Sequence, residues 1–206
     1  MPNEFDLVGQ QWQRKIIVLV VVLLGICLLM ATGSMSPEAD LLHEVMERSG
    51  VLFIMIGILG RTWCSLYIGG YKLSRLATDG PYSLTRNPLY VFSAIAAFGL
   101  GAQLGSFVFA LLCAGATIAI FLLVISHEER ALAERFPVEY PGYKAKVPRF
   151  FPAFRGWHDT DELPVRPGAV YRTFWDAMFF ALAVPGLKAL ESLREVLLPT
   201  PLFRFY

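Results

Sequence analysis

Two adjacent carboxylates, Glu128 and Glu129, end a long apolar run and are the clearest candidates for chemistry in this sequence. Successive residues on a helix point about 100° apart, so the two side chains cannot both face one ligand fully. One could bind a cation while the other pairs with an arginine such as Arg61 or Arg86. The alternative is ordinary interfacial charge at the end of a membrane span. His127, taken alone, is interpreted as structural.

The stretch DGPYSLTRNPLY, residues Asp79–Tyr90, is irregular and polar for a chain that is about to enter a membrane. Gly80-Pro81 predicts a turn, and Asn87-Pro88 predicts a helix start with proline in its first turn. Free backbone N–H groups at such a start, beside Arg86, suit a carboxylate. A helix N-cap that binds no ligand would show the same sequence pattern, so the spacing alone leaves both interpretations open.

Arg61 interrupts an apolar segment. A charged side chain in such a place is costly and usually faces a partner or a watery cavity. The alternative is that the side chain snorkels to the cytoplasmic interface, but that interface is a long reach for one side chain. We therefore favour a functional role or a buried pairing for this arginine.

Aromatic, proline and basic residues alternate in FPVEYPGYKAKVPRFFP, residues Phe136–Pro152. The segment could form an interfacial belt, with its rings at headgroup level and its basic residues on lipid phosphates. It could equally form a flap of aromatic and backbone groups that closes over a planar ring. The sequence contains no Walker A, HExxH, GxSxG or zinc pattern, so no metal is expected. Cys27, Cys64 and Cys113 lie singly in apolar stretches and are interpreted as small buried hydrophobes.

The elements that must position these residues are membrane helices. The chain of 206 residues suggests one domain. Its hydrophobic content of 55% and mean hydropathy of +0.52 indicate a membrane protein. A net charge of +1 leaves no dominant basic face, so we expect no nucleic-acid partner.

The hydropathy pattern predicts four membrane spans. Ile16–Pro37 carries no charge and predicts the first, with a secretory signal peptide as the alternative; Ser49–Tyr71 predicts the second. The uncharged stretch Pro88–Ser126 would reach about 58 Å as one helix, about twice the hydrocarbon core, so it must fold back. The two resulting spans are Leu89–Ala102 and Ser106–Ser126, with the break supplied by Gly99, Gly101 and Gly105.

Basic residues predict the orientation of these spans. They cluster before the first span, between the second and third, and after the fourth, whereas the first loop is acidic. Under the positive-inside rule this pattern predicts a multi-pass membrane protein with both termini in the cytoplasm. The polar segments Tyr71–Pro88 and His127–Pro152 then share the cytoplasmic side, where we expect the active site.

The C-terminal arm is not expected to contain a further membrane span. Trp157–Pro167 is interpreted as a linker and Tyr171–Leu198 as a helix with a break at Pro185-Gly186. Its uncharged core, Ala177–Leu187, is too short to span, which indicates an interfacial helix or one packed on the bundle. The predicted fold is all-α, with a membrane-embedded domain at 1–152 and a linker and helical arm at 153–206.

Together these segments resemble the integral-membrane methyltransferases of the isoprenylcysteine carboxyl methyltransferase and phospholipid N-methyltransferase superfamily. The resemblance covers about residues 50–152, and the order and spacing of its motifs make the set specific although each motif alone is weak. The motifs are Gly60-Arg61-Thr62-Trp63, Leu66-Tyr67-Ile68-Gly69, Gly80-Pro81-Tyr82, Arg86-Asn87-Pro88-Leu89-Tyr90, Glu128-Glu129, Tyr140, Tyr143 and Val147-Pro148-Arg149.

The resemblance implies S-adenosylmethionine as the cofactor, bound on the cytoplasmic side. Asn87 and Tyr90, with Arg86 beside them, would help hold the methionine moiety. Glu129, with Glu128 beside it, would attract the amino group and the sulfonium. The residues implied to line the adenosine are Tyr140, Tyr143, Val147 and Pro148.

Two further positions bear on this resemblance. Gly99 and Gly101 match a GxG that the phospholipid enzymes link to the cofactor. The carboxyl methyltransferases usually have histidine where this chain has Asn87. Asparagine can donate a hydrogen bond but cannot act as a base, which argues against acid–base work at this position.

Methyl transfer from a sulfonium mainly requires an acceptor in line and a stabilised cation. For a carboxylate acceptor no base is required, and Arg61 could orient it. For an amine acceptor a proton must leave, and Glu128 or His127 is the candidate base. A lipidic acceptor could enter sideways between the second, third and fourth spans.

The sequence therefore predicts an S-adenosylmethionine-dependent membrane methyltransferase. Its expected partners are membrane lipids and a lipidic or lipid-attached acceptor, in the first place an isoprenylcysteine-like carboxyl group. Phospholipid N-methylation is the alternative within the class. The alternatives from other classes are a membrane reductase that uses NADPH, because sterol reductases share a similar Asn-Pro/Tyr and aromatic pattern, and a membrane scaffold without catalysis.

Overall fold

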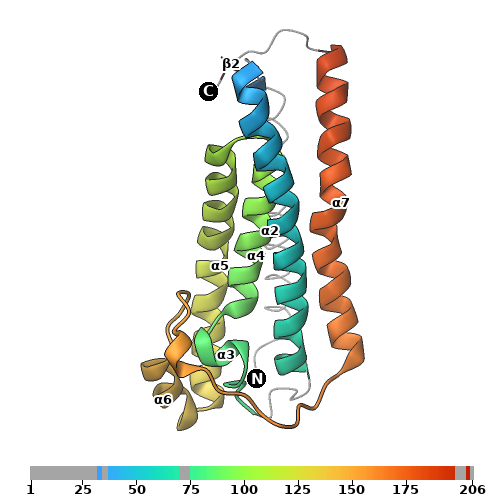
Figure 1. The fold of residues 1–206 in the computed structure, drawn as a ribbon. Coiled ribbons are helices and arrows are strands. Elements are labelled where there is room, and N and C mark those ends of the chain that lie inside the picture. The colour runs from blue at the N-terminus through green and yellow to red at the C-terminus, as the bar shows by residue number, and fades with distance from the viewer. Residues whose placement is uncertain (1–31, 34–36, 70–74, 198–202, 205–206) are drawn as a thin grey trace, which may run out of the picture.

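Four helices lie side by side and form the body of the molecule (Figure 1). The computed structural model describes residues 32–33, 37–69, 75–197 and 203–204. The four helices are α2 (Pro37–Gly69), α4 (Pro88–Ala102), α5 (Phe107–Arg135) and α7 (Pro167–Leu197). Shorter elements gather at one end of this bundle: α3 (Pro81–Leu84), α6 (Glu139–Lys146) and the 3₁₀ helix η1 (Phe154–Gly156). Two-residue strands, β1 (Thr32–Gly33) and β2 (Phe203–Arg204), pair in parallel.

The all-α membrane fold is confirmed. Within the part of the chain that the structure describes, three helices are long and apolar enough to cross a membrane: Glu44–Ile68 within α2, Phe107–Arg135 (the whole of α5) and Pro167–Leu190 within α7. Helix α4 is apolar but shorter. The chain is therefore a multi-pass membrane protein. Of the first predicted span, Ile16–Pro37, the structure describes only Thr32, Gly33 and Pro37.

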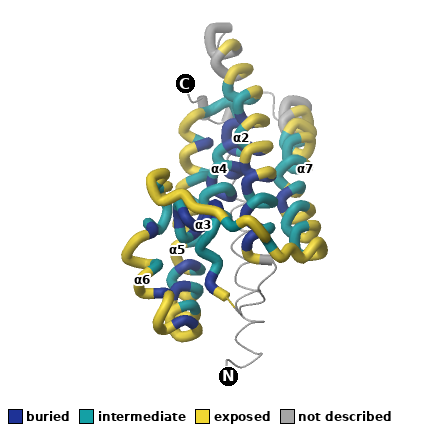
Figure 2. The backbone as a smooth tube through the Cα atoms, turned by 60° about the horizontal axis from the view of Figure 1, so that its bottom comes forward, coloured by how far each residue is buried: buried dark blue, intermediate teal, exposed yellow. Residues whose placement is uncertain are grey.

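Helices α2 and α4 form the centre of the bundle. Buried positions follow these two helices, whereas much of α5 and α7 is exposed (Figure 2). Helix α2 packs against α4 on one side and α7 on another. Exposed apolar side chains on α5 and α7, such as Leu123 and Phe179, face the hydrocarbon when these helices cross a membrane.

The predicted fold-back of the long apolar stretch is also confirmed. Helix α4 ends at Ala102, and Gly105 in the turn has a φ of 67°, a left-handed conformation that glycine adopts without steric cost. The Gln103 side chain donates a hydrogen bond to the backbone oxygen of Glu47 at 2.7 Å and ties the turn to α2. Helix α5 runs well past the predicted end at Ser126, so both glutamates lie on a helix.

The C-terminal arm differs from its prediction. Helix α7 continues through Pro185 without a break, and Pro167–Leu190 is long enough to cross a membrane. The prediction counted only the uncharged core between Asp176 and Lys188, whereas the helix extends past both charges. Long side chains such as lysine can reach the interface from within a span, and transmembrane helices tolerate proline.

Helix α7 is packed on the bundle, which was one of the two expected arrangements. Ala177 is fully buried there, in a cluster with Ile54 and Ile58 of α2. The helix runs away from α3 and α6, so β2 lies near the opposite end of the bundle (Figure 1). The predicted cytoplasmic location of both termini stays a prediction. The N-terminus lies outside the described residues, and the sidedness of the site stays a prediction.

The predicted linker is irregular in structure but is anchored to α2. The Tyr67 hydroxyl donates to the Asp159 carboxylate, 3.0 Å from its nearer oxygen. The ring of Trp157 lies 6.1 Å from that of Trp63, centroid to centroid. These contacts hold the chain against the end of the bundle before it enters α7.

Candidate functional site

Glu129 lies between two arginines near the end of α5. Its carboxylate accepts hydrogen bonds from Arg149 Nε at 3.1 Å and from Arg149 Nη2 at 2.5 Å. Arg86 Nη2 lies 3.3 Å from the same carboxylate, and the Glu129 and Arg86 side chains are only 9% and 10% exposed. One glutamate thus pairs with Arg86, as expected, and Arg149 is a partner that the sequence did not predict. The hydrogen bond to Glu129 raises the pKa of Arg149, so this side chain remains cationic.

Backbone hydrogen bonds join this ion-pair cluster to the start of α4. We call residues 147–153 the strap. The Arg86 amide donates to the oxygen of Pro148 at 2.9 Å, and the Ala153 amide donates to the oxygen of Leu84 at 2.9 Å. The two polar segments that the sequence placed on one side of the membrane are therefore in direct contact.

Two side chains strengthen this contact. Thr85 Oγ1 and Asn87 Nδ2 both donate to the backbone oxygen of Arg149, at 2.9 and 3.2 Å. The Asn87 side chain is thus engaged with the strap, in an interaction that needs only one amide donor. This use explains how asparagine can stand at this position without any base chemistry.

Glu128 faces a different partner from Glu129. Its carboxylate accepts a hydrogen bond from the Tyr90 hydroxyl at 2.7 Å. The centroid of the Tyr90 ring lies 4.4 Å from that of Phe121, so the two rings join α4 to α5. Phe121 and Glu128 are seven positions apart, a spacing that places both on one face of α5. Phe121 is not among the predicted site residues, although this spacing could have indicated it.

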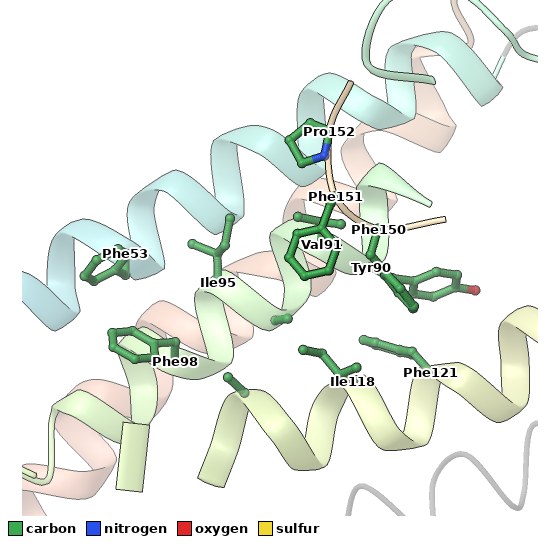
Figure 3. A pocket seen from close by; sticks show the side chains of 12 residues that line it. Phe53, Tyr90, Val91, Ile95, Phe98, Ile118, Phe121, Phe150, Phe151 and Pro152 are labelled. Carbon is green, nitrogen blue, oxygen red and sulfur yellow. The ribbon is translucent and has the colours of Figure 1, made fainter. Parts of the chain in front are cut away.

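An apolar cavity of about 490 Å³ begins at Tyr90 (Figure 3). Phe53 and Phe98 lie at one end of the view, and Tyr90, Phe121 and Phe150 lie toward the other. The cavity is walled by α2, α4, α5 and the strap. Its lining residues are Phe53, Tyr90, Val91, Ala94, Ile95, Phe98, Ala114, Ile118, Phe121, Phe150, Phe151 and Pro152.

A second cavity, of about 550 Å³, has polar and charged side chains among its lining residues. It lies between α3, α6 and η1, and we call it the polar cavity. Two residues implied in adenosine binding, Tyr143 and Val147, contribute to its wall. The other lining residues are Thr78, Ser83, Glu139, Gly142, Lys146, Ala153, Gly156 and His158.

Three tyrosines lie close to the cluster: Tyr82 and Tyr140 are buried and Tyr143 is partly buried. The Tyr143 hydroxyl donates to the backbone oxygen of Tyr82 at 2.8 Å. Burial raises the pKa of both Tyr82 and Tyr143, so both stay neutral at physiological pH. The Tyr140 hydroxyl and Arg86 Nε are buried and have no hydrogen-bond partner among the described residues. Buried donors are normally paired, so these two atoms mark places where a ligand can supply an acceptor.

Arg61 does not join this cluster. Its guanidinium donates to the Ser93 hydroxyl, and its Nε atom is buried without a hydrogen-bond partner among the described residues. Neither Arg61 nor Ser93 is among the residues that line the apolar cavity, although Ser93 lies one helical turn from Tyr90 on α4. The side chain is therefore held between α2 and α4, as expected for a buried pairing, and does not line the apolar cavity.

Gly99 and Gly101 also lie away from the cluster. Gly99 is about 18 Å along α4 from Asn87. A Cβ at Gly99 would lie 2.5 Å from the backbone oxygen of Gly50, and one at Gly101 would lie 2.6 Å from that of Phe109. The structure thus gives these glycines a packing role, which lets α2 and α5 approach α4, and does not bring them to the residues implied in cofactor binding.

Comparison with known proteins adds a family and two relatives. Residues 49–139 match the phospholipid methyltransferase family. The matched region contains Arg86, Tyr90 and both glutamates, and it ends before the strap. The nickel-cobalt-cadmium resistance protein NccN of Alcaligenes xylosoxydans xylosoxydans is 31% identical over 175 residues, which are 85% of this chain and 82% of the relative.

The cobalt-zinc-cadmium resistance protein CzcN of Cupriavidus metallidurans is 37% identical over 131 residues. These residues are 64% of this chain and 60% of that relative. No solved structure matches the chain.

Proposed function

Because this chain belongs to the phospholipid methyltransferase family of membrane proteins, we propose that it transfers a methyl group from S-adenosylmethionine to a lipidic acceptor. The observation that carries the proposal is the hydrogen bond between Tyr90 and Glu128. It places a carboxylate at the mouth of an apolar cavity. A carboxylate there can stabilise a sulfonium, while the cavity holds the apolar part of an acceptor.

The residues around the cluster fit S-adenosylmethionine. The cofactor carries a carboxylate, an ammonium group, a sulfonium and an adenosine, and when bound it supplies a methyl group on positively charged sulfur. Arg86 Nε and the Tyr140 hydroxyl are buried donors that suit its acceptor atoms. The polar cavity, with Tyr143 and Val147 in its wall, has a volume that suits a nucleoside.

The two glutamates are proposed to have different roles. The sequence resemblance implies that Glu129 attracts the ammonium group and the sulfonium of the cofactor. The Glu129 carboxylate, however, is already paired with Arg86 and Arg149. We therefore propose that Glu128 stabilises the positive charge of the cofactor. Glu129 is then a positioning residue that keeps Arg86 and the strap in place. The Tyr90 hydroxyl fixes the Glu128 carboxylate in turn.

Two chemical groups are candidates for the group of the acceptor that receives the methyl. The sequence resemblance favours a carboxyl group of an isoprenylcysteine type, which needs no base, but the proposed orienting residue Arg61 lies off the cavity. A phospholipid amine is favoured by Glu128, because this carboxylate at the cavity mouth can attract an ammonium headgroup and accept its proton. Methyl transfer to a prenylated carboxylate and to phosphatidylethanolamine, measured side by side, separates the two.

The proposal is tested by calorimetric titration of the detergent-purified protein with S-adenosylmethionine, with NADPH as the control. Heat with S-adenosylmethionine alone supports the methyltransferase. Heat with NADPH alone would favour a membrane reductase, and folded protein that binds neither would favour a scaffold.

Substitution of Tyr140 by phenylalanine is expected to weaken S-adenosylmethionine binding roughly two- to tenfold, as one hydrogen bond is lost. The same change should leave the melting temperature of the ligand-free protein unchanged or slightly raised, because it removes a buried hydroxyl that has no partner among the described residues. Tyr143→Phe is the matched control. It removes a hydroxyl that is bonded to Tyr82, so it should lower the melting temperature. Unchanged cofactor affinity in Tyr140→Phe would remove this hydroxyl from the proposed site.

The names of the two relatives suggest a cellular role for the product. Both are named for resistance to divalent metals, cobalt and cadmium among them. We expect this chain, expressed in a metal-sensitive host, to raise growth in cobalt and cadmium, and a Glu128→Gln variant to fail to do so. Equal protection by the variant, at equal expression, would separate resistance from methyl transfer.

A further inference from the structure

Aromatic rings line the end of the apolar cavity that lies farthest along α4 from Tyr90. Phe53 of α2 and Phe98 of α4 meet there edge to face, with ring centroids 5.0 Å apart and planes at 76° (Figure 3). Phe98 also meets Phe107 of α5, with centroids 5.9 Å apart and planes at 77°. Phe98 is thus the middle ring of three that join the helices around the cavity.

We propose that Phe98, supported by Phe53, sets the length of the hydrocarbon chain that the acceptor places in this cavity. The proposal rests on the proposed function, because it takes the occupant to be the chain of the methyl acceptor. It adds a specificity determinant that lies far from the reacting groups.

The chemistry of the cavity selects a hydrocarbon chain as its occupant. The lining has no charged side chain, and its one polar group near the cluster is the Tyr90 hydroxyl. The walls come from apolar helices that lie in the membrane, where lipid chains are the available ligands. The head of an acceptor then lies at Tyr90 and Glu128, and its chain runs along α4 toward Phe98.

The length of this path is fixed by the helix. Tyr90 and Phe98 are eight residues apart on α4, which corresponds to about 12 Å. The next residue, Gly99, is in close contact with α2, since a Cβ there would lie 2.5 Å from the backbone oxygen of Gly50. Helix α4 is therefore held against α2 beside the ring of Phe98. A longer hydrocarbon chain could extend past Phe98 only by separating the two helices, which would break that contact.

The experiment measures binding of lysophosphatidylethanolamines with saturated chains of increasing length to the purified full chain, by native mass spectrometry. Wild-type affinity is expected to rise by about fourfold for each methylene that enters the cavity and then to level off or fall once the chain reaches Phe98. Phe98→Leu and Phe98→Ala should move this limit to longer chains. Phe98→Trp should move it to shorter ones, so the proposal does not depend on one variant.

Phe92→Ala is the matched control. Phe92 lies on the same helix and packs near Gly60 and Trp63, and it does not line the apolar cavity. The limit should stay where it is in this variant. The inference would be overturned if the chain length at which affinity stops rising were the same in wild type and in all folded variants at position 98. It would also be overturned if affinity showed no such length limit.

Methyl transfer to the same lysolipids, measured in parallel, separates this inference from the proposed function. If the length limit of binding changes with the residue at position 98 but no methyl is transferred, the assignment of the cavity to a hydrocarbon chain stands and the proposed function fails. If methyl is transferred with no dependence on position 98, the proposed function stands and the length-setting role of Phe98 is overturned.

Discussion

Replacing Glu129 by glutamine is expected to lower the free energy of unfolding by about 3–5 kcal/mol, because removing one partner of a buried ion pair leaves an uncompensated charge. Two cations depend on this carboxylate, Arg86 at 3.3 Å and Arg149 at 2.5 Å. In thermal unfolding of the detergent-purified protein, the loss corresponds to a fall of the melting temperature by about 6–20 °C. The strap should also loosen, since Arg149 belongs to it, and its amide protons should exchange faster.

Glu134→Gln is the control for this change. It alters a charge on the same helix, but Glu134 is exposed and lies outside the ion-pair cluster, so the melting temperature should hardly change. Combining Glu129→Gln with Arg149→Gln should cost less than the sum of the two single changes, because the double variant also removes one uncompensated charge. Additive losses would show that the two side chains do not interact in the folded protein.

The helical framework could be predicted because its signals are local. The uncharged stretch after Pro88 is too long for one span, and the glycines that follow Phe98 allow a turn, so the fold-back between α4 and α5 follows from the sequence. Helix α7 was underestimated for a physical reason. Counting only the residues between Asp176 and Lys188 ignores that an apolar helix can continue past single charged side chains, and that one near its end, such as Lys188, can reach the interface.

The candidate site was predicted only as a set of residues. Helical spacing shows that Glu128 and Glu129 face different ways, but only the packing of α5 decides which one turns inward. The partner of the inward one, Arg149, lies 20 residues away and reaches it through the strap. No local pattern gives that contact. Gly99 and Gly101 illustrate the opposite case, because a motif match suggested a cofactor role where close helix packing requires the same residue.

The largest effect on activity is expected from Glu128→Gln. The variant should lower the rate of methyl transfer by about 10²–10³-fold, because it removes the one negative charge that we place on the cofactor's cation. Glutamine keeps an oxygen that can accept the Tyr90 hydrogen bond, so the neighbouring ring should stay in place and the melting temperature should change little. The measurement is transfer of isotopically labelled methyl from S-adenosylmethionine into lipid, together with the Kd of the cofactor.

Tyr90→Phe provides the graded control for this prediction. It removes the hydrogen bond that positions Glu128 but keeps the charge and the ring against Phe121, so its rate should fall by about tenfold. The order of the two variants therefore distinguishes charge from positioning. If Glu128→Gln retained the wild-type rate while a folded Glu129→Gln lost it, the cation would have to be assigned to Glu129. The ion pairs of Glu129 with Arg86 and Arg149 would then have to open for the cofactor to bind.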